Sequence, residues 1–176
     1  MFEERSGDQT LTWAYSQICV GTRPWTALGN FMNAWYGYAK ERRFDLISEP
    51  LIQPEQDTPH TQHWGAFCAA TAEYLSSLYD IPCPAWVHHL RYVLPEPWYG
   101  ELEDLLQATP EEQVRQMRIR TTPAPFKRRN IFCGDRLFRN KYEMSEWIKE
   151  ARALGLTNRT EILRYAFTKE RSIHGS

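Results

Sequence analysis

The segment from Thr58 to Tyr79 constrains the fold most, because it carries the strongest helical pattern in the chain. Thr58 suits the N-cap of a helix and Pro59 its first turn, while Asp80 and Pro82 mark its end. Inward-facing residues recur between them in steps of three and four: Trp64, Phe67, Cys68, Thr71, Leu75 and Leu78. Such a face is typical of a long helix that packs against a core.

A second amphipathic helix is predicted after Arg23. Thr22 suits its cap and Pro24 its first turn. Residues at helical spacing then form an aromatic-rich stripe, which we interpret as core: Trp25, Leu28, Met32, Trp35, Tyr36 and Ala39. Residues 40–48 continue as a second helical segment or as a kinked extension that ends before Pro50.

Further helices are predicted along the rest of the chain, with proline-rich connections between them. Their expected ranges are 85–90, 101–108, 110–120, 141–154 and 159–168. Gly155 suits the end of a helix and Asn158 the start of the next, so the last two predict a helix, a tight turn and a helix.

The sequence therefore predicts an all-α fold. Residues 1–22 show no clean apolar period and are expected to form an N-terminal arm or a helix. An irregular helical bundle with proline-rich connections is expected over residues 23–138. A C-terminal helix-turn-helix pair is expected over residues 139–176.

The composition is that of a globular chain with many aromatic residues. Of its 176 residues, 14% are Phe, Trp or Tyr, and such side chains are enriched at protein interfaces as well as in cores. The net charge of −1 argues against a protein that coats nucleic acid over its whole surface, although a local basic patch stays open. The sequence lacks the pattern of a secretory signal and has no apolar run of about eighteen residues. We therefore expect a cytoplasmic protein without a membrane partner.

No residue pattern nominates a catalytic, metal or cofactor site. The cysteines lie far apart in the sequence: Cys19, Cys68, Cys83 and Cys133. They lack zinc spacing and are expected to be buried free thiols, with disulfides as the alternative. His60 and His63 are three residues apart but have no third ligand spaced near them.

Two proline-rich segments hold the candidate site residues. In VLPEPWYG (93–100), Pro95 and Pro97 force an extended path that ends in Trp98 and Tyr99. This rigid aromatic loop either lines a groove or closes the end of a helical core.

The second segment, TTPAPFKRRNIFCG (121–134), combines prolines, basic residues and an apolar stretch. Pro123 and Pro125 keep it extended. Three apolar residues are expected to dock it against the helical body: Phe126, Ile131 and Phe132. Three basic residues lie among them: Lys127, Arg128 and Arg129. These either form a surface for phosphate or an acidic partner, or they pair with acidic side chains of the same chain.

Four stretches of the chain carry a family resemblance: WTALGNFMNAWY (25–36), RRFDLISEP (42–50), VLPEPWY (93–99) and PAPFKRRNIF (123–132). They resemble motifs of a small bacterial family whose genes are associated with genes for nucleotidyltransferase-type toxins. The resemblance implies a toxin encoded nearby, but it implies no active site.

A second resemblance is local to ARALGLTNRTEILRYAF (151–167). The matching residues are Gly155, Leu156, Arg159, Thr160, Glu161, Ile162, Arg164 and Ala166. They resemble the helix-turn-helix half of ribbon-helix-helix repressors, a module that many antitoxins use. Such a repressor needs a DNA-reading strand before its first helix, here near residues 133–139. The alternative is a helix pair that serves packing or dimerisation.

We therefore expect an antitoxin-like regulatory protein that binds and neutralises a partner toxin, without catalytic residues, cofactor or metal of its own. The residues expected to bind the partner are Trp98, Tyr99, Phe126, Arg128 and Arg129. The first alternative is a DNA-binding transcriptional regulator that uses the C-terminal pair and basic residues: Lys127, Arg128, Arg129, Arg136 and Arg139. The second alternative is an enzyme of unrecognised type, and a homodimer stays open.

Overall fold

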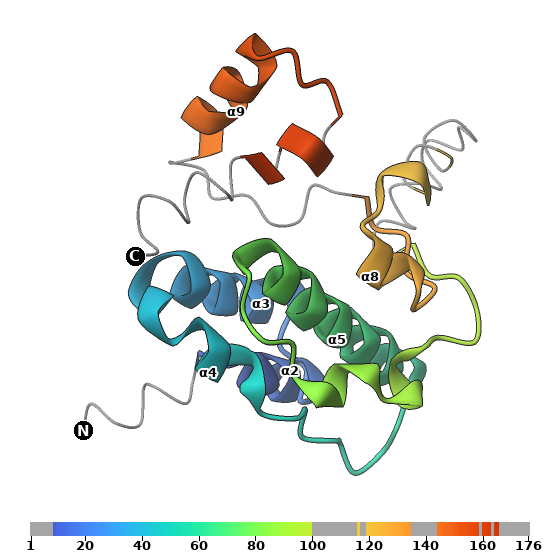
Figure 1. The fold of residues 1–176 in the computed structure, drawn as a ribbon. Helices are drawn as coiled ribbons and strands as arrows, with labels where there is room; N and C mark the ends of the chain where they lie inside the picture. Colours follow the sequence, from blue (N-terminus) through green and yellow to red (C-terminus); the bar gives the residue numbers. More distant parts are fainter. Residues whose placement is uncertain are drawn as a thin grey trace.

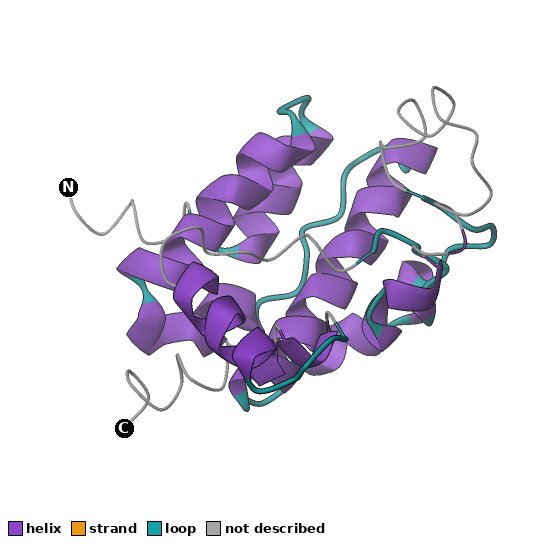
Figure 2. Cartoon of the chain, turned by 90° about the horizontal axis from the view of Figure 1, so that it is seen from above, coloured by secondary structure: helices purple, strands orange, loops and turns teal. Residues whose placement is uncertain are grey.

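The computed structural model describes residues 9–99, 116, 119–134, 144–158, 160–162 and 164–165. These residues are mainly helical, with one isolated β-bridge and no strand, which confirms the predicted all-α class (Figure 1). The helices in chain order are α2 (Leu11–Cys19), α3 (Pro24–Asn33), the π-helix η1 (Ala34–Tyr38), the 3-10 helix η2 (Lys40–Arg42), α4 (Arg43–Ser48), α5 (Pro59–Tyr79), the 3-10 helices η3 (Ala85–His88) and η4 (Leu90–Tyr92), α8 (Ala124–Lys127) and α9 (Met144–Ala153). Long loops connect several of them (Figure 2). None of the described helices has the length and apolarity that crossing a membrane requires.

Helix α5 is the element around which the described body is built, and it contacts α2, α8, η3 and η4 (Figure 1). It begins as predicted. The Thr58 hydroxyl accepts a hydrogen bond from the Thr61 amide at 3.2 Å, and the Thr61 hydroxyl accepts one from the Thr58 amide at 2.9 Å. Thr61 thus takes the place of the Glu or Gln of a usual capping box. All the predicted inward residues of α5 are buried: Trp64, Phe67, Cys68, Thr71, Leu75 and Leu78.

The residue after α5, Asp80, adopts the left-handed conformation, with φ 55° and ψ 47°. A Cβ atom is strained there, whereas glycine is not. We expect Asp80→Gly to raise the free energy of unfolding by about 0.5–1 kcal/mol, measured by urea denaturation. Asp80→Ala is the control and should not stabilise the protein. A less stable glycine variant would show that the carboxylate makes a contact that outweighs the strain.

Helix α2 belongs to the core, so of the arm and the helix expected over residues 1–22 the structure contains the helix. Its buried apolar side chains stand at i, i+3, i+4 and i+7: Leu11, Ala14, Tyr15 and Ile18. The apolar residues that obscure this period in the sequence are Trp13 and Val20, which are 41% and 78% exposed. The Thr12 hydroxyl also accepts a hydrogen bond from the Ile52 amide at 3.0 Å, which fastens α2 to the loop after α4. The helical domain therefore begins before residue 22.

The helix predicted after Arg23 is an α-helix up to Asn33 and a π-helix from Ala34. Helix α3 passes into the π-helix η1, where the Ala39 amide donates to the Ala34 carbonyl at 2.9 Å. Arg43, the first residue of α4, donates from its Nε to the Trp35 carbonyl at 3.0 Å. Its guanidinium lies 4.1 Å from the centre of the Tyr79 ring. These contacts hold residues 40–48, which form a second helical segment, η2 followed by α4, one of the two alternatives that the sequence left open.

The C-terminal part contains the predicted turn between two helices. Gly155 has a φ of 89°, and the Leu156 amide donates to the Ala151 carbonyl at 3.1 Å, which closes the end of α9. The Asn158 side chain accepts a hydrogen bond from the Thr160 amide at 2.9 Å and caps the following turn. Residues 100–115 and 135–143 lie outside the described residues. So do most of the helices expected over 101–120, most of the strand expected near 133–139, and both Arg136 and Arg139.

Candidate interaction site

The two proline-rich segments that hold the predicted site residues pair with each other. The Trp98 amide donates to the Asn130 carbonyl at 2.8 Å, and the Phe132 amide donates to the Trp98 carbonyl at 2.9 Å. These bonds form an isolated parallel bridge between Trp98 and Ile131. The Asn130 side chain adds a hydrogen bond to the Leu94 carbonyl at 2.8 Å. Two segments about thirty residues apart in the sequence therefore form one structural unit.

Arg129 anchors this unit to helix α5. Its side chain is almost fully buried and donates to the Pro125 carbonyl at 2.7 Å, to the Val87 carbonyl at 2.8 Å and to the Glu73 carboxylate. Arg128 donates to the other oxygen of the same carboxylate, but its side chain is 59% exposed. Both arginines therefore pair with an acidic side chain of their own chain, which was one of the two roles that the sequence left open. Glu73 was not predicted as their partner.

The paired arginines control the ionisation of Glu73. Burial alone would raise the pKa of this carboxyl, but the hydrogen bonds and charges of Arg129 and Arg128 outweigh burial and lower it below its ordinary 4.5. A carboxyl with a lowered pKa stabilises the fold at higher pH and loses that contribution as the pH falls through the lowered value.

We therefore expect the wild-type protein to lose stability as the pH falls below about 4.5, the ordinary pKa of this carboxyl. Glu73→Gln should be less stable at neutral pH, because it leaves the buried Arg129 charge unpaired, and its stability should depend less on pH in that range. Urea denaturation of both proteins at several pH values measures this. Parallel pH profiles would show that other carboxyls carry the acid sensitivity.

An aromatic array lies beside this unit. It consists of the rings of Trp25, Trp64, Phe67, Trp98 and Phe126. Adjacent centroids are 5.1 to 6.5 Å apart, and most pairs meet edge to face, which is a favourable geometry for aromatic rings. His63 stacks on Trp98, with centroids 4.7 Å apart and an interplanar angle of 15°.

The array reverses two expectations about which rings are exposed. Trp98 and Phe126, predicted to bind a partner, are 8% and 0% exposed and belong to the core, which agrees with the alternatives that the sequence also gave: closure of the core by the Trp98 loop and docking through Phe126. Trp25, predicted to be core, is 43% exposed, although its ring contacts those of Trp64 and Phe67. The aromatic loop of residues 93–99 therefore closes the core at Trp98. The next residue, Tyr99, is half-buried, and its ring packs against that of Phe132.

Of the basic residues expected to bind DNA, the three that the structure describes do not form one exposed patch. Arg129 is buried, Arg128 pairs with Glu73, and the Lys127 ammonium donates to the Arg120 carbonyl at 3.2 Å. Arg136 and Arg139 lie outside the described residues. In the described part of the chain, this segment is thus a junction. The charge of Arg129 is buried, and those of Arg128 and Lys127 bind groups of the same chain.

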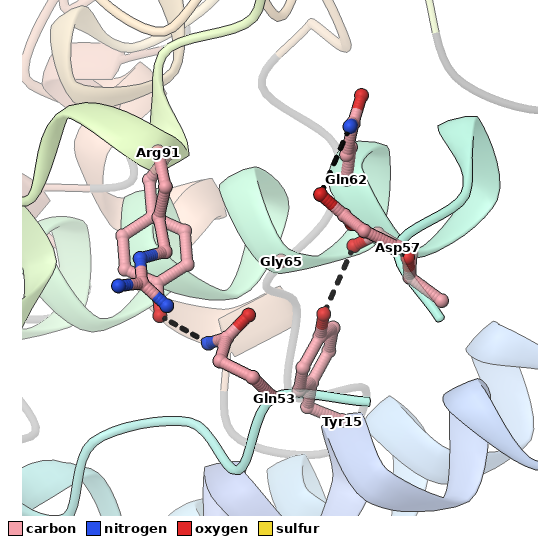
Figure 3. Close-up of a pocket in the computed structure, with 8 residues that line it drawn as sticks. Tyr15, Gln53, Asp57, Gln62, Gly65 and Arg91 are labelled. Atoms are coloured by element: carbon pink, nitrogen blue, oxygen red, sulfur yellow. Dashed lines mark hydrogen bonds between the residues drawn. The ribbon is translucent and has the colours of Figure 1, made fainter. Parts of the chain in front are cut away.

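A polar pocket lies where α2, α5, η4 and the loop before α5 meet (Figure 3). We call it the Asp57 pocket, and its lining residues are Tyr15, Gln53, Asp57, Thr61, Gln62, Gly65, Arg91 and Tyr92. Its free volume is about 30 Å³, whereas small-molecule sites typically hold roughly 300–1,000 Å³. The pocket can therefore receive the end of a side chain but not a substrate of ordinary size.

Hydrogen bonds fix the walls of the Asp57 pocket (Figure 3). The buried Tyr15 hydroxyl donates to the Thr61 carbonyl at 3.1 Å, and burial raises the pKa of this phenol. The side-chain amide of Gln62 donates to the Asp57 carboxylate at 3.0 Å, and the side-chain amide of Gln53 donates to the Tyr92 hydroxyl at 3.0 Å. No sequence motif marks these residues, because they come from four separate segments.

The cysteines are free thiols, as expected, but they differ in burial. Cys68 is buried, Cys19 and Cys133 are partly buried, and Cys83 is exposed. The Cys83 sulfur lies 4.0 Å from Nε2 of His88, yet desolvation raises the pKa of this thiol. A raised pKa disfavours the thiolate, which is the nucleophilic form of cysteine. Among the described residues, no group of three or more His, Cys, Asp or Glu side chains is placed to hold a metal ion.

Comparison with known proteins adds no assignment to this geometry. No protein-family model matches the chain, and no match is found among curated proteins or among solved structures. The candidate site is therefore defined by its own residues: an exposed Trp25 on a rigid aromatic array, and a small polar pocket beside the start of α5.

Proposed function

We propose that the protein binds and neutralises a partner protein, in the manner of an antitoxin that acts on a nucleotidyltransferase-type toxin. The observation that supports binding is the exposed ring of Trp25. The family resemblance of the motifs at 25–36, 42–50, 93–99 and 123–132 supports the class of partner.

Trp25 has the properties of an interface anchor. Its ring is 43% exposed, and its buried side rests edge-on against Trp64 and Phe67, with centroids 5.5 and 5.8 Å away. A ring that is already fixed loses little conformational freedom on binding, so most of its burial contributes to affinity. Tryptophan is also among the residues that most often dominate the binding energy of an interface.

Trp25→Ala should therefore weaken the complex with the partner by about 2 kcal/mol or more, which is about thirtyfold in Kd. We would co-express the protein with the product of the neighbouring gene, copurify the complex and measure Kd by calorimetry. Trp13→Ala is the matched control, because Trp13 is equally exposed, at 41%, but lies on α2 outside the aromatic array. Circular dichroism checks that both variants remain folded.

Two results would contradict the proposal at different levels. If Trp25→Ala binds as tightly as the wild type, the Trp25 surface is not the interface. If the wild-type protein neither copurifies with the neighbouring gene product nor relieves its toxicity, the protein is not its antitoxin.

A further inference from the structure

Cys83 and His88 place two metal-binding side chains next to each other on the segment after α5. The Cys83 sulfur lies 4.0 Å from Nε2 of His88, and both side chains are exposed. Thiolates and imidazoles both bind transition metals, and a thiolate selects soft ions, copper(I) and zinc among them. A metal ion can therefore reach both donor atoms directly from solvent.

The backbone holds this pair in place. Cys83 stands between two prolines, whose rings fix φ, and His88 is the last residue of η3. Val87, which precedes His88, is buried, and its carbonyl accepts a hydrogen bond from Arg129 at 2.8 Å. The backbone therefore loses little conformational freedom when an ion binds between the two side chains.

The distance between the two donor atoms suits one shared ion. A metal ion such as zinc lies about 2.3 Å from a thiolate sulfur and about 2.0 Å from an imidazole nitrogen. Two such bonds put the donor atoms about 4.3 Å apart in a linear arrangement and about 3.5 Å apart at the tetrahedral angle. The 4.0 Å between the Cys83 sulfur and Nε2 of His88 is nearer the linear value. The geometry thus favours a wide angle at the ion.

The number of ligands distinguishes copper(I) from zinc. A zinc site takes at least three protein ligands. Among the described residues, however, no group of three or more His, Cys, Asp or Glu side chains could hold a metal ion. Copper(I) has a filled d shell and is satisfied by two soft ligands in a linear geometry. One thiolate also cancels its single positive charge, so the loaded site carries no net charge.

We propose that Cys83 and His88 bind one copper(I) ion between the Cys83 sulfur and Nε2 of His88. The thiol proton is released to solvent when the sulfur–copper bond forms, and His88 binds as a neutral imidazole that keeps its proton on Nδ1. The ion stays in the reduced state, so no electron is transferred. This inference does not depend on the antitoxin role, and each can fail without the other.

The experiment titrates the reduced full chain with copper(I) under anaerobic conditions, in competition with the chromophoric chelator bicinchoninate, and measures Kd. One equivalent should bind tightly. Cys83→Ser should weaken binding by about a hundredfold or more, and His88→Gln by about tenfold or more. His89→Gln is the matched control, because His89 is also exposed but its Nδ1 accepts the Arg91 amide at 3.1 Å. It should change Kd by less than about twofold.

Two measurements on the wild-type protein do not depend on any variant. Desolvation raises the pKa of the Cys83 thiol, so copper(I) competes with its proton and the affinity should rise by about tenfold from pH 7 to pH 8. In protein with ¹⁵N-labelled histidine, copper(I) should shift the Nε2 resonance of His88 and leave those of His89 in place. The inference is overturned if copper(I) does not bind, if His88→Gln binds it as tightly as the wild type, or if the His88 resonance does not move.

Discussion

Arg129→Ala is expected to lower the free energy of unfolding by about 3–5 kcal/mol, a large part of the stability of a domain of this size. The variant removes a nearly buried guanidinium that binds Glu73 and the carbonyls of Pro125 and Val87. It leaves a partly buried carboxylate with only the exposed Arg128 for compensation, and two carbonyls without this donor. Groups that lose their partners in this way pay their full desolvation cost.

Arg128→Ala is the matched control, because it removes a guanidinium from the same carboxylate. Its side chain is 59% exposed, so solvent screens the pair and the loss should stay below about 1 kcal/mol. Urea denaturation of both variants measures the difference. Equal losses would mean that burial does not distinguish the two arginines. A stable Arg129→Ala variant that fails to bind the partner would show that Arg129 is an interface residue.

Phe126→Ala should destabilise the protein by about 3–5 kcal/mol. The Phe126 side chain is fully buried, and its ring lies 5.2 Å from the ring of Phe67 and 5.9 Å from that of Tyr74. Removing the ring leaves a cavity between α5 and the junction of residues 121–134. Thermal and urea denaturation measure the loss.

Two further variants make this prediction specific. Phe44→Ala removes an equally large ring that is 42% exposed, so it should cost less than about 1 kcal/mol. Phe126→Leu keeps most of the volume and should recover much of the stability. If Phe126→Ala keeps the stability of the wild type but abolishes partner binding, Phe126 would be an interface residue, which is the other role that the sequence predicts for it.

The helices were the predictable part of the fold, because their signals are local. The cap at Thr58, the end at Asp80 and the turn at Gly155 each depend on a few adjacent residues, and the structure contains all three. Helix α2 was harder to recognise, since its buried face of Leu11, Ala14, Tyr15 and Ile18 is interrupted by the exposed Trp13.

Exposure of the aromatic rings could not be predicted in the same way. Trp25 and Trp98 both lie in aromatic-rich segments, and both rings contact Trp64 and Phe67, about 30 to 40 residues away in the sequence. The Asp57 pocket has the same origin, because Tyr15, Asp57 and Arg91 meet only in the folded chain.

One signal in the sequence could have identified the partner of Arg129. Glu73 is the only Asp, Glu, Lys or Arg residue within the 21 residues of α5. A single carboxylate in an otherwise uncharged helix needs a cation from elsewhere in the chain. The dense basic segment at 127–129 was the natural source.

The docking of the segment around Phe126 and Arg129 also bears on how the chain matures during synthesis. Helix α5 and the segments before it leave the ribosome well ahead of residues 123–131, which cover the Phe67 and Tyr74 rings and neutralise Glu73. A nascent chain that has not yet reached this segment carries an uncovered aromatic surface and an uncompensated carboxylate. Transiently exposed surfaces of this kind promote aggregation and chaperone binding. Ribosome stalling within this interval would therefore be more harmful to the yield of native protein than stalling after residue 134.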